Sequence, residues 1–579
     1  MDEQESATSL LGRRLAWRSG VPWREGLEEQ CAGDPVTAWR LLLRHRGLEG
    51  EEDEWFAPRL ARLPDPLSMV DAGKAAARLI TAMERGERVH IFGDFDADGV
   101  AATAVLVEGL RAAGLAVTWE VPHRSDQGHG IAVDSVRRQA ASGCRVGISC
   151  DTGITCFAAA EAAAAHDMDL IITDHHLPEA DGGGALPPAF AILNPARADC
   201  GFAGRRLCGC GVAFFLLAAL WKLLRAAGRP PAYDLKRLLD RVALATIADM
   251  VELTGVNRIL VHHGLARMQQ QPSAGLKALL GVAGCDPGKG VRVETIAWQI
   301  APRINAAGRM DHGETAVRLL LADDPAEAAA LAGEMDALNR RRRSVEAETL
   351  RQVRRRLGDQ GLIAAYDPKW HPGVVGLVAG KLARKAHRPA AIGYLDERET
   401  IHLSLRGVPG FHIQRLLADC SDLLDRFGGH AGAGGCALPK RRWSAFLHRF
   451  ADTVSRQLAE GGIRKPPELI DLALTVDACH LALAERIARF EPTGEGNPPC
   501  RLLLHRAVIH RLRTVGAGAL SLWMRAPGGA GIGAIAFRPG ALAGTLREGM
   551  EVALVGRLER NDWNGNTTAR FVVEDAVTP

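Results

Sequence analysis

The chain reads Val89-His-Ile-Phe-Gly-Asp-Phe-Asp-Ala-Asp-Gly99 where a short apolar run meets three aspartates at alternate positions. Carboxylates this close repel one another unless a cation lies among them. Clusters of oxygen ligands suit hard divalent cations such as Mg²⁺ or Mn²⁺. We therefore predict a strand over 89–93 that leads into a metal site containing Asp94, Asp96 and Asp98.

Two other interpretations of this stretch are a calcium-binding EF-hand loop and a solvated acidic turn. The pattern D-x-D-x-D-G opens an EF-hand loop, whose twelfth position carries a bidentate Glu. Here the twelfth position is Val105, and the residues before the aspartates have the character of a strand. The EF-hand is therefore excluded, whereas the solvated turn has to be weighed against the rest of the chain.

Apolar runs alternate with helical patterns on both sides of this stretch. Strands are expected at 89–93, 117–121, 146–150, 170–173 and 190–194, and helices at 71–85, 100–113, 131–142, 155–166, 208–227 and 234–250. Such alternation is typical of βαβ units. It predicts an α/β fold with a mostly parallel sheet.

Acidic and imidazole side chains follow three of these strands. They are the aspartates of 94–98, then Asp151, and then Asp174-His175-His176. In open parallel sheets, ligands bind beyond the carboxyl ends of the strands, so these groups should converge at one edge. Asp249 ends an apolar helix and is a further candidate ligand; a solvent-facing helix end is the alternative.

This set of side chains suits the hydrolysis of phosphate esters. Two neighbouring divalent cations that share a carboxylate form a clamp on the attacking and leaving oxygens. His176 could donate a proton or hold a phosphate oxygen. The sequence contains neither a visible Ser-His-Asp set nor a Gly-x-x-x-x-Gly-Lys-Ser/Thr loop, so ATP use is not indicated.

The second half of the chain begins with a helix start at Asp324-Pro325-Ala-Glu327. The helix should run to about Leu357 and connect the first domain to a second α/β region that starts at 362–366. That region holds the glycine-rich loop 427–435 near Arg406. Such a loop can be an anion-binding nest or a plain turn.

Short strand-like runs recur after Pro466-Pro467, at 469–476, 501–509, 519–525, 531–537, 550–557 and 569–574. They predict a small β-barrel, either of the OB type that binds single strands or purely architectural. The expected domains are an N-terminal extension packed on the first domain (1–70), a catalytic domain (71–322), a connecting helix (323–358), a second α/β domain (359–466) and the barrel (467–579).

Composition sets wider limits. The chain has 579 residues, too many for one core, with 47% hydrophobic and 24% charged residues, as in ordinary globular proteins. We expect a cytoplasmic protein, because no run of about eighteen apolar residues is present and the acidic start is unlike a secretory signal. The net charge is only +3, and the arginine clusters 340–343 and 354–356 suit either phosphate contacts or a solvated helix face.

Cys200, Cys208 and Cys210 lack a fourth ligand at the usual spacing, so we interpret them as core residues.

Four motifs resemble those of the DHH phosphoesterase superfamily: Gly93-Asp-Phe-Asp-Ala-Asp-Gly99, Cys150-Asp-Thr-Gly-Ile154, Thr173-Asp-His-His176 and Ala245-Thr-Ile-Ala-Asp-Met250. Four further stretches resemble the RecJ family of bacterial single-stranded-DNA exonucleases: Ala301-Pro-Arg-Ile-Asn-Ala-Ala-Gly-Arg-Met310, His371-Pro-Gly-Val-Val-Gly376, Gly428-Gly-His430 and Glu491-Pro-Thr-Gly-Glu-Gly-Asn-Pro498. The resemblance runs from about Leu63 to near the C-terminus.

This resemblance implies 5′-to-3′ hydrolysis of single-stranded DNA to 5′-mononucleotides with two Mn²⁺ or Mg²⁺ ions, in DNA repair and recombination. It implies a DHH domain, a DHHA1 domain and a C-terminal OB domain. The implied metal ligands are Asp94, Asp96, Asp98, Asp151, His175 and Asp249, and the implied catalytic residues are His176 and Asp174. The implied DNA- and phosphate-binding residues are Arg124, Arg303, Asn305, Arg309, His371, Ser404, Arg406, Gly429 and His430.

The chain also departs from family patterns. Phe92 stands where small DHH pyrophosphatases have a His, so the second cation would rely on Asp94, water or substrate and bind weakly. The stretch Arg124-Ser-Asp-Gln-Gly-His-Gly130 keeps the arginine of the family pattern and replaces its Glu and Tyr. Family analogy further suggests a single-strand-binding protein and a RecQ-type helicase as partners, and we expect a monomer.

Two other functions compete with the exonuclease. One is a phosphodiesterase for cyclic dinucleotides or short oligonucleotides, against which the extra residues 467–579 argue. The other is a non-catalytic replication scaffold, against which the occupied ligand positions argue.

Overall fold

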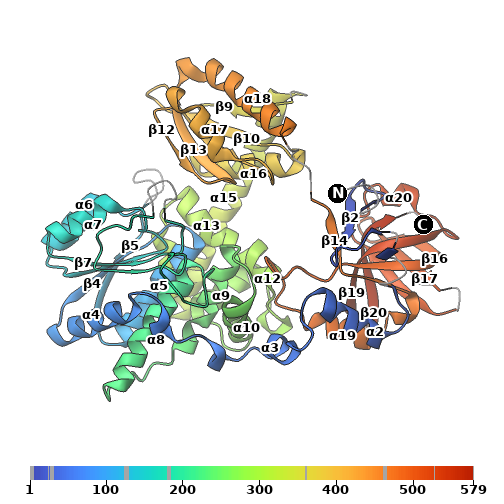
Figure 1. The fold of residues 1–579 in the computed structure, drawn as a ribbon, viewed down its shortest axis with the longest axis horizontal. Helices are drawn as coiled ribbons and strands as arrows, with labels where there is room; N and C mark the ends of the chain where they lie inside the picture. The colour runs from blue at the N-terminus through green and yellow to red at the C-terminus, as the bar shows by residue number, and fades with distance from the viewer. Residues whose placement is uncertain are drawn as a thin grey trace. The chain divides into compact units, whose positions relative to one another are not determined.

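The structure of the protein is a computed structural model that describes residues 6–577, except 24, 27–30, 123–129, 179–183, 359–360, 461–465 and 527–528. The chain forms two compact units (Figure 1). One contains Leu60–Arg464, and the other combines Met1–Arg59 with Lys465–Pro579.

The larger unit contains a five-stranded parallel sheet in the order β5-β4-β6-β7-β8. Its strands are β4 (Arg88–Phe92), β5 (Ala116–Glu120), β6 (Val146–Cys150), β7 (Asp169–Thr173) and β8 (Ala191–Leu193). The predicted parallel sheet is confirmed, and each predicted strand lies within one residue of the observed one at both ends.

Helices cover both faces of this sheet (Figure 1). On one face, α4 (Ala72–Arg85), α5 (Ala97–Ala112) and α8 (Gly209–Ala226) share a core with Ile91 and other buried side chains. On the other face, α6 (Val133–Ala141) and α7 (Phe157–Ala165) pack near Phe92. Because neighbouring residues of a strand point to opposite faces, each strand contributes to both cores.

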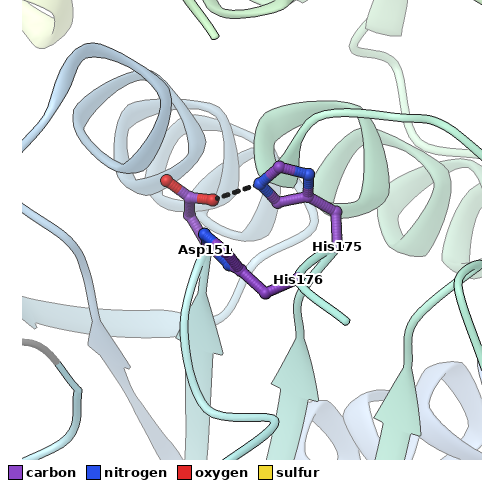
Figure 2. A group of neighbouring side chains, drawn as sticks. All are labelled: Asp151, His175 and His176. Carbon is purple, nitrogen blue, oxygen red and sulfur yellow. Dashed lines mark ion pairs between the residues drawn. The ribbon is translucent and has the colours of Figure 1, made fainter. Parts of the chain in front are cut away.

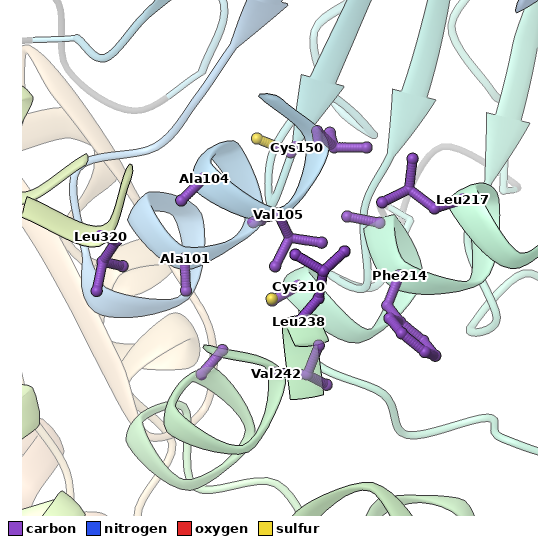
Figure 3. Close-up of a cluster of buried hydrophobic side chains, with 14 of the residues drawn as sticks. Ala101, Ala104, Val105, Cys150, Cys210, Phe214, Leu217, Leu238, Val242 and Leu320 are labelled. Carbon is purple, nitrogen blue, oxygen red and sulfur yellow. The ribbon is translucent and has the colours of Figure 1, made fainter. Parts of the chain in front are cut away.

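Figure 3 shows how α5 and α8 pack together. Val105 of α5 is fully buried in the same cluster as Phe214 and Leu217 of α8. The position that excluded an EF-hand is therefore a core position. Cys208 and Cys210 are buried there too, as the sequence predicted.

One described helix, α8, is long and apolar enough to cross a membrane by length and composition. Within the fold, 72% of its 18-residue window is buried. Its apolar character is therefore explained by its position in the core between α4, α5 and α9.

Helices complete the first domain of this unit. They are α9 (Leu239–Ala248), α10 (Gly255–Gln270), α11 (Ala274–Val282), α12 (Val293–Thr295), the π-helical turn η6 (Ile296–Ile300), α13 (Ala301–Met310) and α14 (Glu314–Leu321). The predicted helix over 234–250 is a short 3₁₀ helix, η4 (Leu235–Leu238), followed by α9, which ends with Asp249 as its C-cap.

The predicted connecting helix is α15 (Pro325–Leu357), capped by Asp324, whose carboxylate accepts the backbone N–H of Glu327. Its first turns, with Leu331 and Met335, lie in the core of the first domain. Its end, with Val353, lies in the next core along the chain. A single helix therefore takes part in both hydrophobic cores of the unit.

The second core belongs to a mixed sheet in the order β12-β13-β11-β10-β9. Its strands are β9 (Ile363–Tyr366), β10 (Ala390–Leu395), β11 (Thr400–Arg406), β12 (Arg426–Gly429) and β13 (Ala433–Pro439), and its helices are α16 (Pro372–Ala386), α17 (Ile413–Asp419) and α18 (Trp443–Ala459). The predicted second α/β region is confirmed. The prediction that 427–435 forms a loop is wrong in part, because this glycine-rich segment supplies most of β12 and the start of β13.

The smaller unit contains a closed barrel whose strands pair around a ring in the order β17, β18, β20, β19 and β16, with β16 also paired to β17. The barrel strands are β16 (Leu502–Val515), β17 (Ala519–Arg525), β18 (Gly531–Ala536), β19 (Glu551–Trp563) and β20 (Asn566–Val577), with α20 (Leu542–Thr545) between β18 and β19. The predicted C-terminal barrel is confirmed. The run predicted as one strand over 469–476 is two, β14 (Glu468–Ile470) and β15 (Leu472–Leu474), in different sheets.

The N-terminal extension (1–70) was expected to pack on the first domain. This expectation is wrong for residues up to Arg59, which belong to the smaller unit, whereas residues 60–70 do pack on the first domain. The described strands and α-helices of the part that joins the smaller unit are β1 (Ala7–Thr8), β2 (Arg14–Trp17), β3 (Cys31–Ala32), α2 (Pro35–His45) and α3 (Glu52–Phe56). β2 pairs with β14 and β3 pairs with β15, while α2 packs against α19 (Leu481–Ala488). Buried Asp471 explains the attachment, since its carboxylate lies 2.6 Å from Arg18 Nε and 2.9 Å from Arg46 Nε.

Candidate metal centre and adjoining groove

Three neighbouring strands of the parallel sheet deliver acidic and imidazole groups to one edge. Figure 2 shows Asp151 directly after β6 and the two histidines after β7, with the His175 ring turned toward Asp151. His175 Nε2 lies 3.1 Å from Asp151 Oδ1, 3.9 Å from Asp98 Oδ2 and 3.7 Å from Asp249 Oδ2. The predicted ligand residues thus come together although they are spread over more than 150 residues of the chain.

Three groups of these side chains have potential ligand atoms within 4.8 Å of one another. The groups are Asp151, His175 and His176; Asp98, His175 and Asp249; and Asp94, Asp96 and Asp151. Each of the six predicted ligands belongs to at least one group. Asp151 and His175 each belong to two of the groups.

The acidic loop is held by its own backbone. Asp96 Oδ1 caps α5 by accepting the N–H groups of Asp98 and Gly99 at 2.9 and 3.1 Å. A Cβ on Gly99 would lie 2.5 Å from the Cβ of Asp94, so only glycine fits there.

Asp98 is fixed by the first turn of α8. Its Oδ2 accepts the N–H of Gly209 at 2.7 Å and its Oδ1 accepts the N–H of Cys210 at 2.8 Å. The positive end of the helix dipole favours this carboxylate. A Cβ on Gly209 would lie 2.6 Å from Asp151 Cβ, so the same helix end also packs on Asp151.

Burial and mutual repulsion disfavour negative charge in this cluster. Burial, followed by the neighbouring aspartates, raises the pKa of Asp151 well above its ordinary value and raises the pKa of Asp249 to about 8. Burial also raises the pKa of Asp98, and it lowers the pKa of His175. Deprotonated carboxylates and a neutral imidazole are the forms that bind metals.

The donor set fits a divalent cation such as Mn²⁺ or Mg²⁺. Asp151 Oδ1 is buried and accepts no hydrogen bond from the described residues. A buried carboxylate oxygen in this state is costly unless a cation is present. Oxygen ligands with one or two imidazoles are the donors that these ions accept.

His176 differs from His175 in its surroundings. Its Nδ1 lies 2.7 Å from Asp174 Oδ1, while 59% of its side chain is exposed. This hydrogen bond raises the pKa of His176 to about 9. Burial opposes the charge on Asp174, yet the hydrogen bonds from His176 and from the N–H of Ile154 hold the pKa of Asp174 below its usual value. Asp174 therefore orients a protonated His176 at the rim of the cluster.

Phe92 is 3% exposed and packs with Leu170 in the core on the α6–α7 face. It offers no ligand atom. The chemistry of the cluster therefore rests on the side chains that follow the strands.

A groove of about 1200 Å³ runs through the larger unit beside the second sheet. Gly308 to Asp311 and Thr155 line it from the first domain. Six of the predicted DNA-binding residues also line it: Arg309, His371, Ser404, Arg406, Gly429 and His430. A Cβ on Gly308 would lie 2.5 Å from the carbonyl oxygen of Phe95, so α13 packs directly against the acidic loop on one side while it lines the groove.

The start of α16 is seated closely against α13. His371 caps the helix by accepting the N–H of Gly373 at 3.0 Å. A Cβ on Gly373 would lie 2.1 Å from the carbonyl oxygen of Arg309. The His-Pro-Gly sequence therefore permits a close approach that brings the groove's two walls together.

Ser404 and Arg406 lie together in the groove. Arg406 donates to Ser404 Oγ at 3.0 Å. A Cβ on Gly376 would lie 2.9 Å from Ser404 Oγ, so a glycine in α16 makes room for this pair. A guanidinium beside a hydroxyl is suited to a phosphate group.

Two predicted DNA-binding residues lie elsewhere. Arg303 pairs with Asp336 of α15 at 2.9 Å and donates to the carbonyl of Gln299. Asn305 Oδ1 accepts the N–H of Ala97 at 2.8 Å, which ties α13 to the acidic loop. Arg124 lies outside the described residues. Direct DNA contacts by these three residues, as by the six that line the groove, remain predictions.

Sequence reasoning passed over Tyr394, His402 and Arg426, which also line the groove. A usable signal was present in β11. His402, Ser404 and Arg406 alternate along one strand and therefore share a face.

Family models match three parts of the chain: the DHH family N-terminal domain at 88–246, the DHHA1 domain at 359–460 and the RecJ OB domain at 470–575. Together with the acidic and histidine cluster, they define a DHH-type phosphoesterase. The single-stranded-DNA-specific exonuclease RecJ of Bacillus subtilis is 32% identical over 98% of this chain and 71% of its own length. The Escherichia coli protein of the same name is 34% identical over 87% of this chain and 89% of its own length. The chain belongs to the RecJ family.

Solved structures agree with this assignment. The crystal structure of RecJ from Thermus thermophilus in complex with Mn²⁺ superposes with a TM-score of 0.77, at 32% identity, over 96% of this chain and 78% of that chain. The Mg²⁺ complex from the same organism has a TM-score of 0.71, at 30% identity, over 95% and 78% of the two chains.

Proposed function

We propose that this protein is a metal-dependent exonuclease that hydrolyses single-stranded DNA from the 5′ end and releases 5′-mononucleotides. One observation carries the proposal: the ligand cluster around Asp151 and His175 adjoins, through α13, a groove that carries Arg406 and five other predicted phosphate-binding residues. The names of the related RecJ proteins support the same activity.

Asp98, His175 and Asp249 would hold one cation, and Asp94, Asp96 and Asp151 would hold the other. When bound, two such divalent cations activate water for attack and neutralise charge on the phosphate. Asp98 is positioned for this role before any cation binds, because two N–H groups of α8 orient its carboxylate.

His176 would act on the phosphate directly. Asp174 holds its Nδ1 and raises its pKa to about 9, so the ring carries a proton at neutral pH. A protonated imidazole at the edge of the cluster can hold a non-bridging phosphate oxygen or donate a proton to the leaving oxygen.

The pair Ser404–Arg406 would bind the terminal 5′ phosphate, with His430 nearby in the same groove. This arrangement would select a strand end and leave the next phosphodiester bond near the cluster.

The proposal is tested with 5′-phosphorylated single strands labelled at either end, in the presence of Mn²⁺. Release of labelled mononucleotide from the 5′ end is expected, with blunt duplex left intact. Equal release from both ends would contradict the polarity.

The family relationship motivates three further proposals about the cell. They are a cytoplasmic location, action in DNA repair and recombination, and partnership with a single-strand-binding protein and a RecQ-type helicase. Co-purification of the tagged full chain with either partner from its native host would test the partnership.

A further inference from the structure

The face of the second sheet that borders the groove carries two separate sets of polar side chains. On β11, His402, Ser404 and Arg406 share this face, while Leu403 and Leu405 point into the core. Arg406 lies four positions after His402, which corresponds to roughly 13 Å along an extended strand. The groove is therefore longer than one phosphate site at Arg406 requires.

Cross-strand pairing places a row of side chains at the His402 level. Tyr394 is the direct partner of His402 on β10, and Ala437 is its partner on β13. Arg426 is in turn the partner of Ala437 on β12. Tyr394, His402 and Arg426 thus lie in one row and line the groove.

The aromatic members of this row form a stacked pair. The ring centroids of Tyr394 and His402 are 4.8 Å apart, and the ring planes differ by 16°. Nucleobases stack on aromatic surfaces of this kind in proteins that bind single strands.

The His402 ring is held at both nitrogens. Its Nε2 lies 2.8 Å from Asp396 Oδ2, and its Nδ1 lies 3.4 Å from a guanidinium nitrogen of Arg426. The ring therefore donates to Asp396 and accepts from Arg426. Both rings of the stack are oriented before a ligand arrives, which lowers the entropic cost of binding.

Small residues lie between the two polar sets. Gly428 and Gly435 are paired with each other, and Gly435 is paired with Ser404. No side chain rises from the sheet at these two positions, so a ligand can approach the backbone closely.

We propose that the row of Tyr394, His402 and Arg426 is a second nucleotide subsite in the groove. An unpaired nucleobase stacks on the Tyr394–His402 pair, and Arg426 binds the phosphate next to it. The subsite rests on the proposed function, since it serves a strand whose 5′ phosphate is bound at Arg406. With this subsite, the groove binds at least one base as well as the terminal phosphate.

The test uses the full chain with Mn²⁺ and 5′-phosphorylated oligothymidylates in which one nucleotide at a time lacks its base. In the unaltered protein, loss of the base at one position is expected to raise KM about tenfold. That position-specific penalty should disappear in Tyr394→Leu and in His402→Ala, because the stacking surface is gone. KM for the complete strand should rise in the same variants.

Tyr366→Leu is the matched control for Tyr394→Leu. Tyr366 is the partner of Gly393, the residue before Tyr394, so strand alternation places it on the opposite face of the sheet. There its ring contacts Trp443 of α18, with centroids 4.9 Å apart. The penalty should persist in this variant. Its loss there, or its persistence in both Tyr394→Leu and His402→Ala, would overturn the subsite.

Arg426→Ala provides a second readout, which reports on the phosphate instead of the base; the Arg426 side chain is exposed. A neutral methylphosphonate in place of the adjacent phosphate should raise KM in the unaltered protein and have no further effect in Arg426→Ala. A full additional effect in Arg426→Ala would contradict the phosphate contact. Absence of hydrolysis of every single strand would instead overturn the proposed function.

Discussion

The backbone N–H of Gly209 donates to Asp98 Oδ2 at 2.7 Å, which joins the first turn of α8 to a ligand of the candidate metal centre. The neighbouring N–H of Cys210 holds the other oxygen of the same carboxylate. The core helix α8 therefore orients the Asp98 side chain of the site.

Asp98→Ala is expected to lower the rate of hydrolysis more than about a hundredfold, because it removes a metal ligand. Binding of single-stranded DNA should survive, since the groove is lined by other residues. The rate is measured with end-labelled strands, and binding is measured by fluorescence anisotropy without added metal. Asp98→Asn, which preserves the shape and an acceptor for α8, separates loss of the ligand from loss of folding. Full activity in Asp98→Ala would show that the ligand assignment is wrong.

Asp174→Asn is expected to slow hydrolysis about 10- to 100-fold, because Asp174 orients and charges His176. The two residues should behave as one unit. The double variant with His176→Ala should therefore be little slower than His176→Ala alone. Single-turnover rates of the three variants provide the comparison. Independent, multiplicative losses would mean that Asp174 acts by another route.

Removal of divalent cations with a chelator is expected to stop hydrolysis and to lower the melting temperature. The cation relieves repulsion among buried carboxylates, and a ligand at about 100 times its Kd stabilises the fold by about 2.7 kcal/mol. Differential scanning fluorimetry with and without Mn²⁺ measures the shift. Asp151→Asn should show a much smaller shift, because Asp151 belongs to two of the ligand groups. A shift of the same size in this variant would place the stabilising cation elsewhere.

Gly373→Ala is expected to raise KM for single-stranded DNA and to destabilise the larger unit by about 1–3 kcal/mol. The added Cβ would lie 2.1 Å from the carbonyl oxygen of Arg309, so the start of α16 has to move away from α13. Gly380→Ala, in the same helix, would bring no contact closer than 3.9 Å and serves as the control. Steady-state kinetics and thermal melting compare the two. Equal behaviour of the two variants would show that the close approach at Gly373 has no part in shaping the groove.

Asp471→Ala is expected to destabilise the smaller unit by about 3–5 kcal/mol, because a buried acceptor for Arg18 and Arg46 is lost. Hydrogen exchange should accelerate in β2 and in the barrel together, since both belong to this unit. Glu49→Ala breaks an exposed pair with Arg44 and should cost less than about 1 kcal/mol. Exchange that accelerates only in the N-terminal residues would show that the barrel is stable without them.

Local patterns predicted several elements closely. The strands of the parallel sheet were found within one residue, because buried parallel strands are short apolar runs bounded by turns. The long helix α15 was predicted from its Asp-Pro-x-Glu start, whose capping hydrogen bond is present. Cys208 and Cys210 were placed in the core because their spacing fits no metal site, and they are buried there.

Other features depended on pairing partners that local patterns do not contain. The glycines of 427–435 have little strand propensity, yet they form β12 and β13 because neighbouring strands offer hydrogen-bond partners. The N-terminal residues show no clear period, and their attachment to the barrel depends on Asp471, which is more than 400 residues away from Arg46 in the chain.

For the candidate site, the order of residues was enough to predict which aspartates and histidines meet. Asp98, Asp151 and His175 each follow a strand of one parallel sheet, and the carboxyl ends of parallel strands share an edge, so topology alone brings these three together. Asp249 reaches the same edge from the end of α9. Packing in three dimensions decided the rest. It paired Arg303 with Asp336, turned Asn305 toward the acidic loop, and left Arg406 in the groove. The reason is that a side chain's partner is the nearest group once the helices and sheets have packed, and distance along the chain does not reveal which group that is.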